Sequence, residues 1–403
     1  MHPGTLILIM AAAVLAPVLA QAAGRWIRVP LVIFEILLGV LVGPAVLGWA
    51  HPDTVVDTLS DLGLAMLIFL AGYEIEWGAV RGDTLRRSLW AWLIALVLGI
   101  GVALALTAGD TARSVVIGTA LTSTALGTVL PVLRDSGDLK GRFGTVMLAF
   151  GAVGEFGPII AMALLLSGRR PAESVALLAG FAVITAAAVL WALRPRSPWF
   201  SRVVANTLHS SGQFAVRFVM LLLVSMLALA AVFGLDTLLG AFAAGVLTRI
   251  VLDGAAPDSG KEVLGRIEAL GFGFLVPLFF VVTGIEFDLD ALLDGGRPLA
   301  LLPLFLLLFL LVRGLPVYAL APRDLGRTDR WALTLYSATC LPLVVAITAI
   351  GLDRRVISSG EAAALVGAAM VSVLAFPLLA LRLRAGEGRA SPAAAKGTGP
   401  EAW

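Results

Sequence analysis

The chain has 403 residues, of which 59% are hydrophobic and only 14% are charged. Its mean hydropathy of +0.98 excludes a soluble globular domain and indicates a membrane protein that spans the bilayer several times. The formal net charge of +2 is too small to indicate a nucleic-acid partner.

Apolar segments of about 20 residues, the length that crosses a bilayer as a helix, recur about thirteen times. No Lys or Arg precedes the first of them, so we interpret it as a membrane span and not as a secretion signal. We predict an all-α membrane domain over residues 1–385 and a small, polar, disordered cytoplasmic tail at 386–403. The predicted spans are 5–23, 30–49, 58–77, 88–107, 113–134, 143–167, 173–193, 213–233, 235–251, 268–287, 298–320, 330–351 and 361–382.

The basic residues indicate how these spans are oriented. With the N-terminus outside, the inner connections and the tail hold 21 Lys and Arg residues, whereas the outer connections hold 6. Basic residues concentrate on the cytoplasmic side of membrane proteins. We therefore predict an integral protein of the plasma membrane, the inner membrane of a bacterium, with its N-terminus outside and its C-terminus in the cytoplasm.

Two sequence motifs occur twice. Residues 72–76 (GYEIE) and 284–288 (GIEFD) both read Gly-x-Glu-x-acid, and glycine-rich segments precede them at 37–43 (LLGVLVG) and 238–245 (LLGAFAAG). The copies lie seven spans apart, an odd number, so the second copy is inverted relative to the first. This pattern predicts two inverted-topology repeats of six helices each. The predicted repeats cover 5–167 and 213–382, and the linker helix between them covers 173–193.

Polar residues interrupt one span in each predicted repeat. Discontinuous helices expose backbone groups near the midplane, where transporters built from inverted repeats bind their substrate. We predict that the two broken helices cross, with breaks at Thr122, Gly127, Thr339 and Pro342. The alternative is ordinary packing of hydroxyl groups against helix carbonyls. The polar residues are Thr122, Ser123, Thr124 and Thr128 in the span 113–134, and Ser337, Thr339 and Cys340 in the span 330–351.

Charged residues lie deep inside two predicted spans. Glu155 is at the centre of the span 143–167, and Arg313 lies about 10 Å from the nearer end of the span 298–320. An ionised group in the hydrocarbon core is costly unless it is paired or solvated, so such residues usually mark a functional site. A third acid, Glu35, is expected to form a hydrogen bond within its own repeat.

Three segments resemble the monovalent cation:proton antiporter superfamily, which has the sodium/proton exchanger-like fold. RVPLVIFEILLGVLVGPAVLG is similar to the second span of that family, and DLGLAMLIFLAGYEIEW is similar to its third. LTSTALGTVLPVLRDSGDLKGRFG resembles the family's crossover helix and the loop after it, with Thr124 on the family threonine. The resemblance covers essentially all of residues 5–382.

The resemblance implies a secondary active transporter that exchanges Na+ or K+ for protons by alternating access. It places Glu155 on the ion-binding acid, with Ser123, Thr124 and Gly154 beside it and Arg313 as the charge partner. The cation at Glu155 is then cargo, so no fixed metal and no cofactor is implied, and the expected partners are the lipid bilayer and a second copy in a homodimer. Two departures affect the site: Glu155 replaces an Asp, and Gly154 replaces the usual Asn, Asp or Gln.

Two other transport interpretations remain open. The same fold could serve a sodium-coupled organic-anion symporter, or a transport-inactive relative in which Glu155 and Arg313 form a structural ion pair. A membrane-embedded hydrolase is disfavoured, because the sequence has no His-Glu-x-x-His motif and no His inside a predicted span. We therefore expect a protein that is not an enzyme.

Overall fold

The computed structural model describes residues 3–24, 30–74, 82–139, 141–165, 171–192, 207, 213–255, 260–293 and 296–390. Residues 75–76 of the first Gly-x-Glu-x-acid motif, residues 166–167 and 193 at the ends of two predicted spans, and residues 391–403 of the predicted tail lie outside this part. Within the described residues the regular structure is entirely helical, as the composition predicts.

The helices follow one another with short connections. They are α1 (Pro3–Ala23), α2 (Leu31–Val42), α3 (Thr54–Glu74), α4 (Asp83–Leu106), α5 (Thr111–Ala120), α6 (Leu126–Ser136), α7 (Arg142–Leu165), α8 (Pro171–Ala192), α10 (Phe214–Val232), α11 (Thr237–Ala255), α12 (Gly260–Leu270), η1 (Gly271–Leu275), α13 (Val276–Ile285), α14 (Leu289–Leu293), α15 (Arg297–Leu308), η2 (Phe309–Gly314), α16 (Leu315–Leu320), α17 (Arg327–Ser337), α18 (Pro342–Asp353) and α19 (Ser359–Ala390).

Eleven segments of the described chain are long and apolar enough to cross a membrane, which confirms an integral membrane protein. They match eleven of the thirteen predicted spans. Of the other two, 30–49 contains the 12-residue helix α2, and 113–134 is divided between α5 and α6. Their crossing of the bilayer stays a prediction. The last helix continues through residues 386–390, which had been predicted to belong to the tail.

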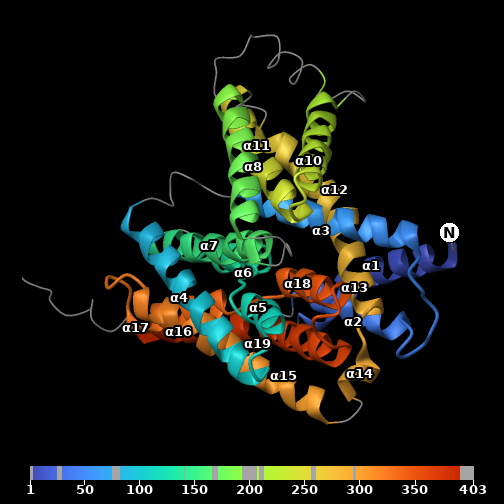
Figure 1. Cartoon of the computed structure of the whole chain (residues 1–403), viewed down its shortest axis with the longest axis vertical. Helices are drawn as coiled ribbons and strands as arrows, with labels where there is room; N and C mark the ends of the chain where they lie inside the picture. Colours follow the sequence, from blue (N-terminus) through green and yellow to red (C-terminus); the bar gives the residue numbers. More distant parts are fainter. Residues whose placement is uncertain are drawn as a thin grey trace, which may run out of the picture.

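The helices form two groups. In one group, α8, α10, α11 and α12 stand together and α11 packs across α3 (Figure 1), while α2 packs on α13 and α1. In the other, α4 packs on α5, α7 and α16, and α19 packs on α15, α17 and α18. The two groups meet mainly where α7 touches α8 and α11, and where α6 touches α3. The broken helices both belong to the second group.

Glycines let helices of the first group approach closely. A Cβ atom on Gly39 of α2 would meet the carbonyl oxygen of Val281 in α13, and one on Gly284 of α13 would meet the carbonyl oxygen of Ile36 in α2. Small residues of this kind are what bring backbones together in membrane helices. The glycine-rich segment 37–43 therefore packs on the second Gly-x-Glu-x-acid motif.

The reciprocal pair of motifs packs in the same way. A Cβ on Gly72 of α3 would meet the Phe242 carbonyl oxygen, and a Cβ on Gly245 of α11 would meet the Phe69 carbonyl oxygen. Each glycine-rich segment thus faces the acid motif of the other predicted repeat. This exchange is the arrangement that an inverted repeat requires, and the repeat itself stays a prediction.

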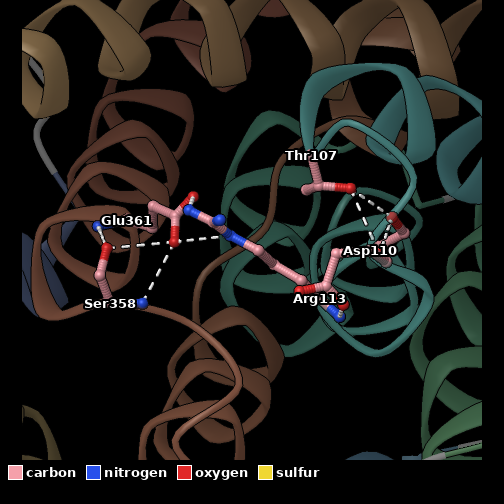
Figure 2. A network of polar contacts seen from close by, with 6 residues as sticks. Thr107, Asp110, Arg113, Ser358 and Glu361 are labelled. Carbon is pink, nitrogen blue, oxygen red and sulfur yellow. Dashed lines mark hydrogen bonds and ion pairs between the residues drawn. The ribbon is translucent and has the colours of Figure 1, made fainter.

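An ion pair fixes one end of α19 (Figure 2). Glu361, in the first turn of α19, accepts hydrogen bonds from Nε of Arg113 at 3.0 Å and from its Nη2. The backbone N–H and the hydroxyl of Ser358 donate to the same carboxylate, both at 3.1 Å. Arg113 lies in the first turn of α5, which Asp110 caps by accepting its N–H at 3.1 Å. The first broken helix is thereby fastened to α19.

The other end of α19 is fastened to the remaining halves of the broken helices. Arg384 pairs with Asp138, just after α6, at 3.1 Å and with Asp329, in the first turn of α17. Its guanidinium carbon lies 3.8 Å from the ring centroid of Phe143. A partly buried cation shared by two carboxylates holds geometry better than an exposed pair. The helix α19 therefore braces both broken helices.

We expect Gly39→Leu to lower the free energy of unfolding by about 1–3 kcal/mol, the usual cost of overpacking. The added side chain would have to displace the backbone of α13. Thermal unfolding of the purified protein in detergent measures the change. Gly101→Leu is the matched control, because Gly101 lies in the apolar helix α4 with no atom within 4 Å of its Cβ position. Equal melting temperatures for the two variants would contradict the close α2–α13 contact.

Candidate functional site

The first break lies between α5 and α6, at residues 121–125. Two of its hydroxyls turn back to the preceding helix: Thr122 donates to the carbonyl of Thr119 and Ser123 to that of Ala120, both at 2.8 Å. They satisfy carbonyls that the end of a helix leaves without partners. Thr122 lies in the break as predicted. Gly127 does not, because it is the second residue of α6.

The second break lies between α17 and α18, at residues 338–341. Thr339 is inside it and donates to the carbonyl of Leu335 at 3.0 Å, and Pro342 begins α18. Proline suits the first turn of a helix, where an N–H would have no intrahelical partner. The N–H of Cys340 donates to the hydroxyl of Ser372 in α19 at 3.1 Å. Both predicted breaks in 330–351 are therefore correct.

The two breaks meet and bond to each other. The N–H of Ala125 donates to the carbonyl of Thr339 at 2.7 Å. The hydroxyl of Thr124 donates to the carbonyl of Ser337 at 2.6 Å. Backbone groups in an apolar interior must be paired within the protein, so each break supplies what the other lacks. The predicted crossing of discontinuous helices is present.

Arg313 joins this crossing to α7. Its side chain is fully buried; Nε donates to the Thr124 hydroxyl oxygen at 3.0 Å, and Nη2 donates to the carbonyl of Phe150 in α7 at 2.7 Å. It lies in the π-helical turn η2, two residues before Pro316 begins to interrupt the helical ladder. Proline removes an N–H, and π turns are common where a side chain must be re-aimed.

Gly154 makes room for this contact. A Cβ atom on Gly154 would collide with Nη2 of Arg313 and with the Thr124 hydroxyl. Its carbonyl oxygen accepts the N–H of Thr124 at 2.9 Å. That oxygen is available because residue i+4 is Pro158, inside α7, which has no N–H to donate. The glycine that replaces the family's polar residue is thus occupied by the guanidinium of Arg313 and the first break.

Glu155 is the next residue on α7 and points elsewhere. Its side chain is 3% exposed, and its Oε2 atom has no hydrogen-bond partner in the protein. The backbone N–H of Leu126, at the start of α6, lies within reach of the carboxylate. A helix N-terminus carries a partial positive charge that favours an anion. One carboxylate oxygen is left free inside an apolar core.

The structure does not pair Glu155 with Arg313. No ion pair within 4.0 Å links Arg313 to a carboxylate in the described part of the chain; its partners are a hydroxyl and a carbonyl. Phe150 and Gly154 lie one helical turn apart and face Arg313, whereas Glu155 is rotated by about 100° from Gly154. The predicted direct charge partnership is therefore wrong for this conformation, and Arg313 instead clamps the break to α7.

Two small cavities flank this crossing, and neither was predicted from the sequence. One, of about 230 Å³, is lined by Gly127 of α6 together with Glu74, Arg134 and Glu268. Glu74 and Arg134 form an ion pair in it at 4.0 Å. The sequence signal was present in the Gly-x-Glu-x-acid motif, but the position of Glu74 at a span end suggested only contact with water.

The second cavity, of about 260 Å³, lies at the other end of α7. It is lined by Met162 and Ala163 of α7 and by Asp236, Asp353 and Arg354. Asp236 accepts the N–H of Leu238 at 2.9 Å and so caps α11. Burial raises the pKa of the Asp236 carboxyl above its ordinary value, and the hydrogen bond from Leu238 and the charge of Arg354 oppose that rise.

The site provides one buried carboxylate, backbone oxygens at two breaks and a fixed cation. No cluster of three or more His, Cys, Asp or Glu side chains suited to a bound metal occurs among the residues that the structure covers. A carboxylate in such surroundings can hold either a proton or a hard monovalent cation. This donor set belongs to ion transport more than to covalent chemistry.

The family model for the sodium/hydrogen exchanger transmembrane domain matches residues 10–381. The chain belongs to this family, which is a family of membrane transporters and not of enzymes. The fold matches the sodium proton antiporter MjNhaP1 of Methanocaldococcus jannaschii with a TM-score of 0.67 at 17% identity, covering 95% of this chain and 96% of that one.

Relatives with curated names are similar over most of the chain. YjbQ of Bacillus subtilis, whose name places it among the Na(+)/H(+) antiporters, is 27% identical over 93% of this chain. Cation/H(+) antiporter 18 of Arabidopsis thaliana is 29% identical over 75%, and the Na(+)/H(+)-K(+) antiporter GerN of Bacillus cereus is 26% identical over 65%. The aligned region covers 62%, 39% and 67% of these three relatives, respectively.

We expect Gly154→Ala to destabilise the protein, although Ala is favoured over Gly in a helix by about 1 kcal/mol. The methyl group would displace Arg313 or Thr124 and break a buried hydrogen bond, which costs about 1–3 kcal/mol. Thermal unfolding in detergent measures the net effect. Gly265→Ala, in α12 with no atom within 4 Å of its Cβ position, is the control and should be neutral or stabilising. A Gly154→Ala protein as stable as this control would show that the clamp is unimportant.

Proposed function

We propose that the protein is a secondary active transporter that exchanges a monovalent cation, Na+ or K+, for protons. The observation that carries this proposal is the buried carboxylate of Glu155, which has a free oxygen beside the crossing of two broken helices. Membership of the sodium/hydrogen exchanger family and the names of the relatives support it.

Glu155 is proposed as the group that protons and cations share. A carboxyl group in an apolar core is stable when it is protonated or when a cation neutralises it, and it is costly when it is ionised alone. Proton and cation therefore compete for one place. Backbone carbonyls at the breaks and the hydroxyl of Ser123 are the proposed further oxygen ligands, since hard cations prefer oxygen.

Thr124 and Gly154 are proposed to position this site. The Thr124 hydroxyl donates to Ser337 and accepts from Arg313, so it holds the breaks in place. Arg313 is proposed to remain charged throughout the cycle, because a guanidinium keeps its proton under all ordinary conditions. With one titrating group beside a permanent cation, one proton leaves for each cation bound, which makes the exchange electroneutral.

Alternating access is proposed to come from relative movement of the two helix groups. The two small cavities approach the crossing from different directions, one beside Gly127 of α6 and the other at Met162 of α7. The ion pairs of α19 hold the broken helices together as a unit. The membrane orientation with the N-terminus outside, the division into inverted repeats and the homodimer are part of the same proposal.

The competing idea of a transport-inactive relative depends on a structural ion pair between Glu155 and Arg313. That pair is not formed. Glu155 has no protein partner on Oε2, which is unfavourable for a purely structural acid. The geometry therefore favours a carboxylate that exchanges its ligand.

We expect Glu155→Gln to abolish sodium- or potassium-driven proton movement in proteoliposomes that carry a pH-sensitive dye. The amide keeps the size of the side chain but neither binds a proton at neutral pH nor neutralises a cation. Supplying Na+, K+ and Li+ in separate runs identifies the cation. Glu262→Gln, a substitution near the start of α12 and away from the crossing, should keep the full exchange rate. Exchange in Glu155→Gln at the rate of this control would overturn the assignment.

A further inference from the structure

A third and larger cavity, of about 860 Å³, lies apart from the crossing. On one side it is bounded by α1, α2, α3 and α13, and on the other by α6 and α19. Its walls are mainly aliphatic and aromatic. A volume of this size is typical of sites that bind a drug-sized molecule. Representative lining residues are Leu31, Val32, Val276, Phe280, Val132 and Leu381.

One acid lies in this apolar wall. Glu35 of α2 lines the cavity with its side chain 3% exposed, and among the described residues it has neither a hydrogen-bond partner nor an ion pair. The expectation that it hydrogen-bonds within its own repeat is therefore wrong. A buried carboxyl without a partner is costly, and native proteins keep such groups chiefly where a ligand completes them.

The surroundings of Glu35 decide which ligand fits. A bare alkali cation needs several oxygen ligands, whereas the only side-chain hydroxyl in this wall, that of Thr128, already donates to the Ala125 carbonyl at 2.9 Å. A protonated amine needs one carboxylate for its N–H groups and can place its hydrocarbon part against apolar walls. Charge and shape thus favour an amphipathic ammonium over Na+ or K+.

We propose that the cavity is a binding site for amphipathic organic ammonium ions, with Glu35 as the anchor for the ammonium group. The ligand would lie between the two groups of helices, because α2 and α13 belong to one and α6 and α19 to the other. On the exchange mechanism proposed above, such a ligand blocks the relative movement and inhibits transport.

Binding can be measured without transport. The probe is a naphthylalkylamine, compared with the naphthylalkyl alcohol of equal chain length, titrated against the purified full chain in detergent at neutral pH. Naphthalene fluorescence reports binding. We expect the amine to bind the wild-type protein about tenfold or more tightly than the alcohol, the ratio that a charge-assisted hydrogen bond supplies.

Two variants separate the anchor from the cavity. Glu35→Gln should bind the amine and the alcohol equally, whereas Glu286→Gln, an acid at the end of α13 outside the cavity, should keep the preference for the amine. Gly127→Leu should weaken both probes, because a side chain at Gly127 meets only Leu67 at 3.8 Å and so projects into the cavity.

Equal binding of amine and alcohol to the wild-type protein, or an unchanged amine preference in Glu35→Gln, would overturn the proposal. So would unchanged affinity for both probes in Gly127→Leu. Loss of exchange activity has no part in these measurements, so failure of the proposed transport function would leave their outcome readable.

Discussion

Two interruptions of helices in an apolar interior depend on each other. Each break exposes backbone N–H and C=O groups that water cannot reach, and each finds its partners in the other, through Ala125 with Thr339 and Thr124 with Ser337. Because unpaired groups cost several kcal/mol in such surroundings, neither break is stable alone. Arg313 extends this dependence to α7, and α19 extends it to the ends of the broken helices.

The same constraint explains the two departures from the family pattern. Gly154 has no side chain because the Arg313 guanidinium and the Thr124 hydroxyl fill the space beside it. Pro158 frees the Gly154 carbonyl, which then accepts the Thr124 N–H. Glu155 is the residue that remains unconstrained. A longer carboxylate with a free oxygen, held next to a rigid crossing, suits a group that must exchange one small cation for another.

Much of this architecture is readable from the sequence. Apolar length identifies most of the spans, and the clusters Thr122–Thr124 and Ser337–Cys340 locate both breaks, because only polar groups near a break can satisfy its carbonyls. The direction of side chains is not readable in this way. Whether Arg313 meets Glu155 or Phe150 depends on the rotation of α7 by about one residue, or 100°, and packing partners decide that rotation. Gly127 was misplaced for a related reason, since a glycine in a first turn resembles a break.

The account rests on one carboxyl group that holds either a proton or a cation. Infrared difference spectra of the protein in lipid, with sodium minus without, test this directly. The account predicts that sodium removes the C=O stretching band of a protonated carboxylic acid and that Glu155→Gln abolishes this change. A band that sodium leaves untouched in the wild-type protein, or that sodium still removes in Glu155→Gln, would contradict it.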